Sequence, residues 1–353
     1  MKISVSGLRM YSECPRKWYY SFFTSIPKKT NYHFLCGSGV HRHVACLHKK
    51  PAQPRKFFFK SKKSAIAAWF NRWQRALKDA KEQKKLVFID EDKEKKYGQV
   101  GAICIANYWN DNVRKPDPLE IESYYQTRLK GGILLRGRFD QVRRVPLGYI
   151  ESHRPELIKK GALDSRYQAT VIVDIKTGYP GYGYYQPEDN LPLMEKVRLQ
   201  YSLHEDFQAT LYCYLYEKTT GKKPIGFIWY YLRNRKTFFT YRKEKDYEVL
   251  LDAIHHFREN VQNHSFPKNP SNRCKYCDFL KACREDRCFL MVEPEELFQG
   301  SAEIKEISNT VKKENYLQLR LKLKIPRKKK KSKFPRPQRD DNIILKNLPW
   351  DQK

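Results

Sequence analysis

The feature that most restricts the fold of this chain is a charged pair inside a short run of β-branched residues. The segment TVIVDIKTG (170–178) has the composition of a core strand, yet it carries Asp174 between Val173 and Ile175. An aspartate on a core strand costs free energy unless a partner compensates its charge. Lys176 lies two residues further and projects from the same face of the strand. The segment therefore predicts a sheet strand that carries either a cation site or a buried ion pair.

The two interpretations of this pair differ in function. A carboxylate can hold a divalent cation such as Mg²⁺, which prefers carboxylate oxygens together with substrate phosphate oxygens. The cation then polarises the phosphate and acidifies water, and the neighbouring ammonium lies beside that water. The simpler interpretation is a structural Asp–Lys ion pair. Since Asp-x-Lys is very common in proteins, this tripeptide alone favours the simpler interpretation.

The surrounding elements predict a mixed α/β domain with a central sheet. Helical spacing starts after Ser6 and again near Ser38. Gly131-Gly132 divides a hairpin, and Gly221 ends a later helix. The expected helices are 7–22, 38–50, 61–83, 94–114, 195–219 and 246–263, the expected strands 124–145, 170–178, 224–234 and 236–242, and the expected loop 179–192.

Three further motifs surround Asp174 and Lys176. GSGVH (37–41) places His41 at an expected helix start, GRFD places Asp140 on the hairpin, and QATLY (208–212) places Gln208 and Tyr212 on one helix face. In this order, and with an early CPRKWYY, the motifs resemble those of the PD-(D/E)XK nucleases. They most resemble the RecB-like exonuclease branch, which includes the CRISPR-associated RecB-like exonucleases and the AddB nuclease domain. The resemblance spans residues 4–288.

The resemblance implies a restriction-endonuclease-like core, with a central mixed sheet flanked by helices, a helical insertion and a metal-stapled C-terminal segment. It implies that Lys176 orients or activates water, and that Gln208 and Tyr212 brace the site and contact the DNA strand. The implied ligands of Mg²⁺ or Mn²⁺ are His41, Asp140, Asp174 and the Ile175 carbonyl.

His41 has a competing structural interpretation, because His43 and His48 lie nearby and a lone histidine is more often a packing residue than a ligand. Its position four residues after Gly37 favours a ligand.

The cysteines suggest a second metal centre. Cys274, Cys277 and Cys283 follow a C-x2-C-x5-C spacing that lets three thiolates converge. The resemblance implies that Cys14 is the fourth ligand of a [4Fe–4S] cluster that staples both ends of the domain. Cys288 is an alternative fourth ligand, and structural Zn²⁺ is the alternative metal. Reduced core cysteines are the default for Cys36, Cys46, Cys104 and Cys213.

The charge of the chain points to a polyanionic partner. Lys and Arg number 70 against 39 Asp and Glu, a net charge of +31. The last 33 residues, 321–353, contribute +9, so residues 1–320 retain +22. This distribution favours nucleic acid over an anionic membrane. The tail is expected to be a flexible basic arm, serving either nucleic-acid binding or solubility and targeting.

Location and domain organisation follow from what the sequence lacks. No apolar run is long enough for a membrane helix, and the first residues contain no signal-peptide core. We therefore expect an intracellular protein, in cytoplasm or nucleoid, or in the host cell if it is viral. Residues 1–320 are expected to form one nuclease domain, with an insertion at about 51–123 and a cysteine segment at 266–288, followed by the tail 321–353.

The predicted function is a metal-dependent DNA nuclease, an exonuclease or a single-strand-preferring enzyme of recombination, repair or processing. Candidate partners are DNA ends or single strands and recombination or replication proteins. The alternative is a non-catalytic nucleic-acid-binding or scaffolding subunit of a recombination complex. Helicase activity is not expected, since no Walker motif is present. The aromatic loop 178–192 either stacks single-stranded bases or packs on the body.

Overall fold

The computed structural model describes residues 2–26, 29–48, 59, 61–87, 89–112, 115–179, 193–271, 273–274 and 277–286. These residues belong to two compact units, one that contains the described chain up to Phe266 and one that starts at Pro267. Cys288, the tail 321–353 and nearly all of the aromatic loop lie outside the described residues.

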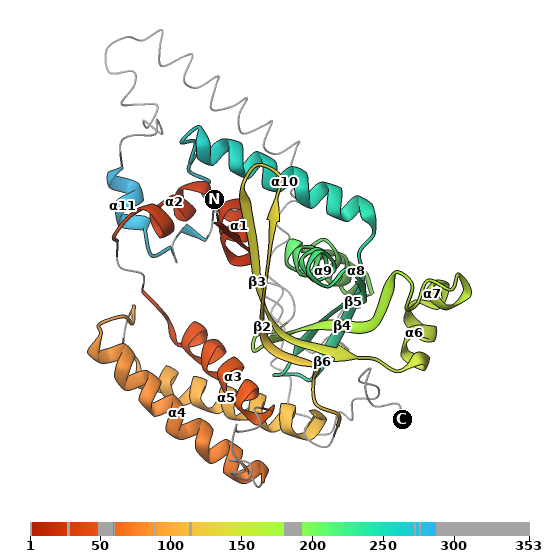
Figure 1. The fold of residues 1–353 in the computed structure, drawn as a ribbon. Coiled ribbons are helices and arrows are strands. Elements are labelled where there is room, and N and C mark those ends of the chain that lie inside the picture. The colour runs from red at the N-terminus through yellow and green to blue at the C-terminus, as the bar shows by residue number, and fades with distance from the viewer. Residues whose placement is uncertain are drawn as a thin grey trace. The chain divides into compact units, whose positions relative to one another are not determined.

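A six-stranded mixed sheet forms the centre of the first unit (Figure 1). The strand order is β1-β3-β4-β5-β6, and β2 pairs with β3. The β1–β3 and β4–β5 pairs are parallel, and the other pairs are antiparallel. The strands are β1 Lys2–Ser4, β2 Glu120–Leu129, β3 Ile133–Arg144, β4 Tyr167–Lys176, β5 Lys223–Tyr231 and β6 Lys236–Thr240.

Helices cover both faces of the sheet and form two hydrophobic cores. One core contains side chains of α1 Val5–Glu13, α2 Pro15–Phe23, α8 Leu193–His204, α9 Phe207–Thr220 and α10 Glu244–Gln262. The other contains side chains of α3 Tyr32–His48, α4 Lys62–Glu82, α5 Glu91–Asn112, α6 Leu147–His153 and α7 Pro155–Lys159. The structure thus confirms the expected mixed α/β fold with a central sheet flanked by helices.

Two expected helices are each divided in two. Ser4, rather than Ser6, caps α1, and its hydroxyl accepts the Gly7 N–H at 3.1 Å. The helix stops at Cys14, which adopts an extended conformation, because Pro15 disfavours helical geometry in the preceding residue and cannot donate a backbone hydrogen bond. The expected helix 195–219 is likewise interrupted after His204, and Asp206 caps α9 through the Gln208 N–H at 2.8 Å.

The prediction that His41 lies at a helix start was wrong. Helix α3 begins at Tyr32, so His41 lies in its second half. Gly37 and Gly39, which suggested a helix start near Ser38, are accommodated within the helix because its core residues Cys36, Val40 and Val44 are buried.

Helices α4 and α5 fall within residues 51–123, the segment expected to be an insertion, and lie beside α3 (Figure 1). The hairpin that follows begins at Glu120, slightly before its expected start at residue 124. The insertion shares a hydrophobic core with α3 and with β4 and β5. It is therefore an integral layer of the first unit.

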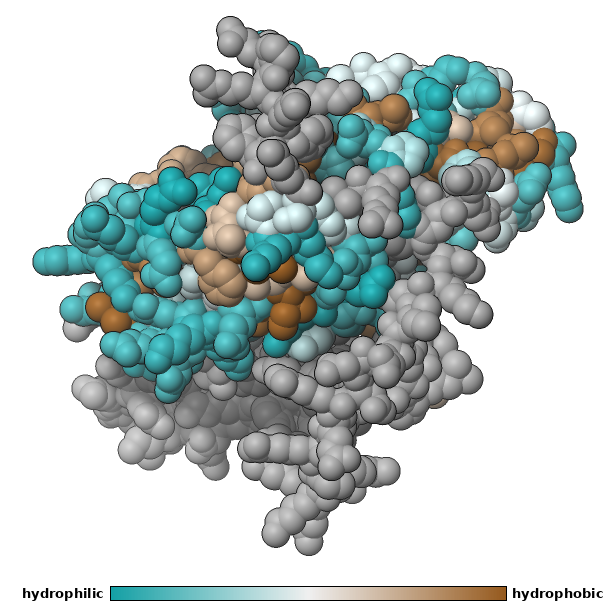
Figure 2. Space-filling model, turned by 90° about the horizontal axis from the view of Figure 1, so that it is seen from below, coloured by the Kyte–Doolittle hydropathy of each residue, from teal (hydrophilic) through white to brown (hydrophobic). Residues whose placement is uncertain are grey.

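No helix among the described residues combines the length and apolarity needed to span a membrane. The face shown in Figure 2 is largely hydrophilic where its residues are described, and its hydrophobic side chains form small separate patches.

The second unit contributes residues 267–271, 273–274 and 277–286 to the described chain, with the short helix α11 Leu280–Glu285. Lys268 Nζ donates to the backbone carbonyls of Cys283 and Asp286, at 2.6 and 2.8 Å. These contacts tie Lys268 to α11 and to the residue that follows it.

Candidate active site

The candidate catalytic residues surround an opening in the sheet. Strand β2 occupies one edge of β3, so β1 and β4 must share the other edge. There β1 pairs with Leu134–Arg136, whereas β4 pairs with Gln141–Arg144. Among the described strands, none lies beside residues 137–140 on that edge. The carboxyl ends of β1 and β4 face each other across this gap, which contains GRFD.

Asp140 connects α3 to the two central strands at this gap. Its Oδ1 lies 3.0 Å from Nδ1 of His41, and its Oδ2 accepts the backbone N–H of Ile175 at 2.7 Å. The Ile175 contact replaces the ladder hydrogen bond that a longer strand pairing would supply. Asp140 is thereby fixed beside the end of β4, next to Asp174.

Asp174, Lys176 and Gln208 form one bonded group. Lys176 Nζ lies 2.7 Å from Asp174 Oδ2 and donates to Gln208 Oε1 at 3.2 Å. Gln208 Nε2 donates to Asp174 Oδ1 at 2.6 Å. The side-chain amide of Gln208, on α9, therefore bonds to both members of the Asp-x-Lys pair.

Tyr212 reaches the same gap from the next turn of α9. Its hydroxyl donates to the Arg138 carbonyl at 2.8 Å. A Cβ at Gly137 would stand 3.0 Å from Tyr212 Cε1, so the glycine of GRFD permits this close approach. The structure brings all the side chains expected at this site, from His41 to Tyr212, into one region.

The electrostatics of the site reflect two carboxylates held close together. Burial and the neighbouring Asp140 raise the pKa of Asp174 to about 6, although Lys176 opposes the shift. Burial also favours neutral Asp140, but His41 outweighs it and holds the pKa of Asp140 below its ordinary value. The Asp140 carboxylate likewise overcomes burial and raises the pKa of His41 to about 9. This arrangement of negative charge favours a bound cation.

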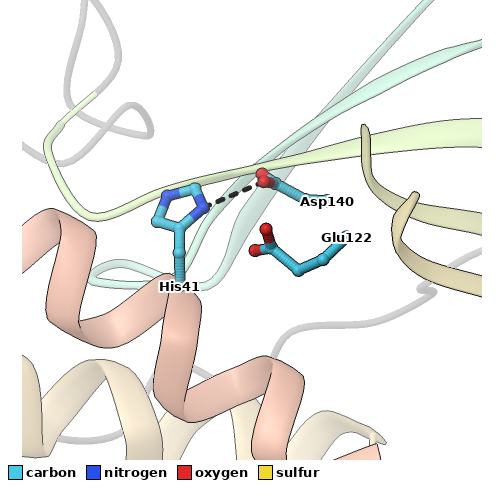
Figure 3. Close-up of side chains that lie close together, drawn as sticks. All are labelled: His41, Glu122 and Asp140. Carbon is cyan, nitrogen blue, oxygen red and sulfur yellow. Dashed lines mark hydrogen bonds and ion pairs between the residues drawn. The ribbon is translucent and has the colours of Figure 1, made fainter. Parts of the chain in front are cut away.

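Glu122 is the site residue that sequence reasoning missed. Ligand atoms of His41, Glu122 and Asp140 lie within 4.8 Å of one another (Figure 3). Glu122 has a left-handed φ of 52°, an uncommon and strained conformation for glutamate. Its neighbours Ile121 and Ser123 pair with Gln141 and Phe139, the residues on either side of Asp140 in β3. Glu122 Oε2 lies 2.7 Å from Arg138 Nε. The carboxylate of Glu122 therefore lies within reach of a cation held by His41 and Asp140.

A signal for Glu122 was present in the hairpin. The β2–β3 register pairs Leu129 with Ile133, so it is centred on Gly131. Glu122 and Asp140 are equally distant from this glycine and must face each other if the pairing extends that far. Counting back across the turn from GRFD therefore points to residues 122 and 123, and the register that selects Glu122 is set by the folded hairpin.

The donor set fits a hard divalent cation. Carboxylate oxygens predominate, and one imidazole accompanies them, as suits Mg²⁺ or Mn²⁺. The Lys176 ammonium lies 2.7 Å from the buried Oδ2 of Asp174 and bonds to it. A carboxylate oxygen has a second lone pair, which a metal ion can use.

The other histidines of α3 have structural roles. His43 is fully buried, and its ring packs near Phe59 and Trp69. His48 bonds to Asp117 and Tyr108 at 2.7 and 2.6 Å. Of the three, His41 alone belongs to the candidate site, which favours the ligand interpretation over packing.

The cysteine segment has local features of a thiolate site. The Cys277 N–H donates to the Cys274 carbonyl at 3.0 Å, forming a tight turn, and the Ser271 N–H donates to Cys274 Sγ at 3.3 Å. Cys283 lies on α11, and Cys14 lies between α1 and α2 in the first unit. These cysteines are half-buried. They are not part of the spatial ligand group identified among the described residues, which consists of His41, Glu122 and Asp140.

Comparison with known proteins agrees with this geometry. The family model described as "PD-(D/E)XK nuclease superfamily" matches residues 2–151 and 162–284, well over half of the chain. The matched ranges contain every residue of the candidate site and the four cysteines expected to bind metal. No curated protein shows significant sequence similarity to the chain.

Proposed function

The chain belongs to the PD-(D/E)XK nuclease superfamily, and from this premise we propose that it is a DNA exonuclease of the RecB-like branch that acts on single strands or ends. Membership implies a metal-dependent nuclease, a phosphodiester hydrolase with DNA as its substrate. The observation that carries the proposal is the meeting of His41, Asp140, Asp174 and Lys176 at the gap in the sheet. A scaffold without catalysis would not need this combination of charges.

The proposed ligands of Mg²⁺ or Mn²⁺ are His41, Asp140, Asp174 and the Ile175 carbonyl, with Glu122 as an additional carboxylate. A divalent cation, when bound, supplies Lewis-acid polarisation of a phosphoryl oxygen and acidifies water. Removing one carboxylate should therefore disable cleavage while the basic surface that binds DNA remains.

Lys176 has the central role among the residues that are not ligands. Its ammonium, held by Asp174 and Gln208, orients the attacking water and stabilises negative charge on the phosphate. Gln208 fixes the ammonium and the carboxylate relative to each other. Tyr212 holds the Arg138 backbone through its hydroxyl. This bond fixes the edge of β3 at the gap, where the DNA strand would lie.

Action on single strands or ends is supported by the local surface and by the motif resemblance. Exposed Tyr124 of β2 and two arginines of β3, Arg136 and Arg138, lie at the rim of the site, where an unpaired strand can use both stacking and charge. Roles in recombination, repair or DNA processing, and partners among recombination or replication proteins, follow from the RecB-like resemblance.

We also propose that Cys14, Cys274, Cys277 and Cys283 hold a [4Fe–4S] cluster with a structural role, structural Zn²⁺ being the alternative. The turn at Cys274 and the N–H···S contact from Ser271 support thiolate ligation there. The family match, which includes both Cys14 and the cysteine segment, supports a nuclease domain that extends through this segment.

Digestion of end-labelled single- and double-stranded DNA tests the activity. With Mg²⁺ or Mn²⁺ we expect stepwise shortening from an end, and EDTA should stop it. Asp174→Ala and Lys176→Ala should each abolish cleavage while DNA binding persists. Asp252→Ala, which changes a carboxylate of α10 outside the site, is the control. Cleavage by both site variants at the parental rate would refute the site, and DNA binding without cleavage by the parental protein would instead support a non-catalytic subunit.

A further inference from the structure

We infer that the cavity beside the candidate active site is a subsite for one nucleotide of the strand being cut, with its phosphate on Arg136 and its base on Tyr124. The inference deepens the proposed function and rests on it, because it assigns the substrate contact next to the scissile bond.

The cavity occupies the gap in the sheet between β1 and β4. Its volume is about 400 Å³, and it is open to solvent. Lys176, Gln208 and Tyr212 line it on the catalytic side. The remaining lining residues come from β1, α1, β2 and β3: Ser4, Val5, Ser6, Arg9, Tyr124, Arg136, Gly137 and Arg138. A ligand in this space therefore lies directly beside the Asp-x-Lys pair.

The charge of the lining selects an anion. Four of the lining residues are cationic and none is acidic. Three of the cations already have acidic neighbours: Arg138 pairs with Glu122 at 2.7 Å, Lys176 with Asp174 at 2.7 Å, and Arg9 lies 3.8 Å from Glu13. Among the described residues, Arg136 is therefore the lining cation without an acidic neighbour.

Arg136 is half-buried and, among the described residues, has neither a hydrogen-bond nor an ion-pair partner for its side chain. A guanidinium removed partly from water without a partner is costly, and a phosphate oxygen pair matches its fork of donors. Arg136 also pairs in register with Ser4 of β1, so the groups at the start of α1 are its neighbours.

The start of α1 adds polar groups suited to phosphate. Ser4 and Ser6 both line the cavity, and their hydroxyl oxygens are 3.3 Å apart. Helix α1 has no acidic residue in its first turn, so the positive end of its dipole is not neutralised locally. The two hydroxyls and the start of α1 add donors from other directions than the Arg136 guanidinium. A tetrahedral phosphate can use donors from several directions, whereas the two oxygens of a carboxylate lie in one plane.

Tyr124 gives the cavity a place for a base. It lies on β2, its side chain lines the cavity, and it is 57% exposed. It pairs across the β2–β3 ladder with Arg138, another residue that lines the cavity. An exposed aromatic ring beside a phosphate site stacks unpaired bases with little sequence preference. A base within a duplex could not reach it without being unstacked, which is why the subsite fits a single strand.

The first test measures binding of a fluorescent oligo-dT 12-mer in EDTA, so that no cleavage occurs. Arg136→Ala should weaken binding about tenfold and make the dependence of log K on log salt shallower by about 0.7, the loss of one phosphate contact in a single strand. Arg144→Ala, which removes an exposed arginine at the far end of the same strand, should change affinity less than twofold. Equal losses in the two variants would overturn the phosphate assignment.

The second test concerns the base. Tyr124→Leu should weaken binding about tenfold, whereas Tyr124→Phe should retain it, because stacking needs the ring and not the hydroxyl. Tyr201→Leu, at an exposed tyrosine of α8, is the control. Parental affinity in Tyr124→Leu would overturn the nucleotide assignment, even if Arg136→Ala behaves as expected.

The two proposals fail in distinguishable ways. If the parental protein cleaves DNA but Arg136→Ala and Arg144→Ala bind equally well, the subsite is wrong and the nuclease assignment stands. If the parental protein never cleaves DNA but Arg136→Ala and Tyr124→Leu selectively lose affinity, the strand-binding site stands and catalysis is wrong. Thermal unfolding of each variant verifies that the fold is intact.

Discussion

The Nδ1 atom of His41 lies 3.0 Å from Oδ1 of Asp140, although 99 residues of sequence separate them. The contact joins helix α3 to strand β3 at residues 137–140, where, among the described strands, neither β1 nor β4 pairs with the edge of β3. Helix α3 therefore completes a site that the sheet begins.

Glu122→Gln should weaken Mn²⁺ binding about tenfold or more, because it removes one of the three carboxylates around the site. Calorimetry or paramagnetic resonance of Mn²⁺ measures this effect without DNA. Glu120→Gln is the matched control, since Glu120 lies on the same strand and bonds to Tyr125 instead. Unchanged Mn²⁺ affinity in Glu122→Gln would remove Glu122 from the ligand set.

Gln208→Leu should lower kcat about 10- to 100-fold with little change in the KM for DNA, because Lys176 and Asp174 lose the amide that holds them together. The kcat and KM values from steady-state digestion separate this effect from weaker binding. Gln200→Leu removes a comparable side-chain contact, to the Phe239 carbonyl, and should leave kcat near the parental value. A loss confined to KM would instead assign Gln208 to DNA binding.

Gly101→Ala should destabilise the protein by about 1–3 kcal/mol through overpacking. A Cβ at this position would lie 1.9 Å from Cζ2 of Trp69, a fully buried ring on α4. Denaturant unfolding measures the change. Gln99→Ala, at an exposed position of the same helix α5, should have an unchanged or slightly higher free energy of unfolding. Parental stability in Gly101→Ala would show that Trp69 can move aside.

The free energy of unfolding should fall as the pH is lowered below about 6.5, in part through His48. Burial outweighs the Asp117 hydrogen bond and, with Arg143 nearby, lowers the pKa of His48 below 6.5 in the folded state. The unfolded state then binds more protons below pH 6.5, so the stability present above that pH is lost as acid is added. His48→Gln should reduce the loss between pH 7.5 and 5.5. An identical loss in both proteins would contradict this assignment.

Anaerobically purified protein should be brown and contain about four irons and four sulfides per chain. Serine at Cys14, Cys274, Cys277 or Cys283 should bleach the colour and lower stability, because a thiolate ligand is lost. Cys46→Ser is the matched control, as Cys46 is also half-buried but contacts Arg72. One zinc and no iron in an iron-replete preparation would replace the cluster with a zinc site.

Local sequence determined much of this protein. The β-branched run around Asp174 specified a core strand, and its period of two residues put Lys176 beside the carboxylate. Gly131 and Gly132, both with positive φ, specified the hairpin turn. The i, i+4 spacing put Gln208 and Tyr212 on the same side of α9, where both reach the gap. These features depend on periodicity and backbone sterics, which act over a few residues.

Tertiary structure decided the rest. The sequence could not show that β1 and β4 share an edge of β3 and leave residues 137–140 uncovered, because the pairing of β1 with β3 joins strands that lie more than 100 residues apart in the chain. It did not reveal that Glu122, strained at a φ of 52°, joins His41 and Asp140. A carboxylate becomes a ligand only through neighbours that lie far away along the chain. The distance between such groups depends on the packed fold, which local propensity does not encode.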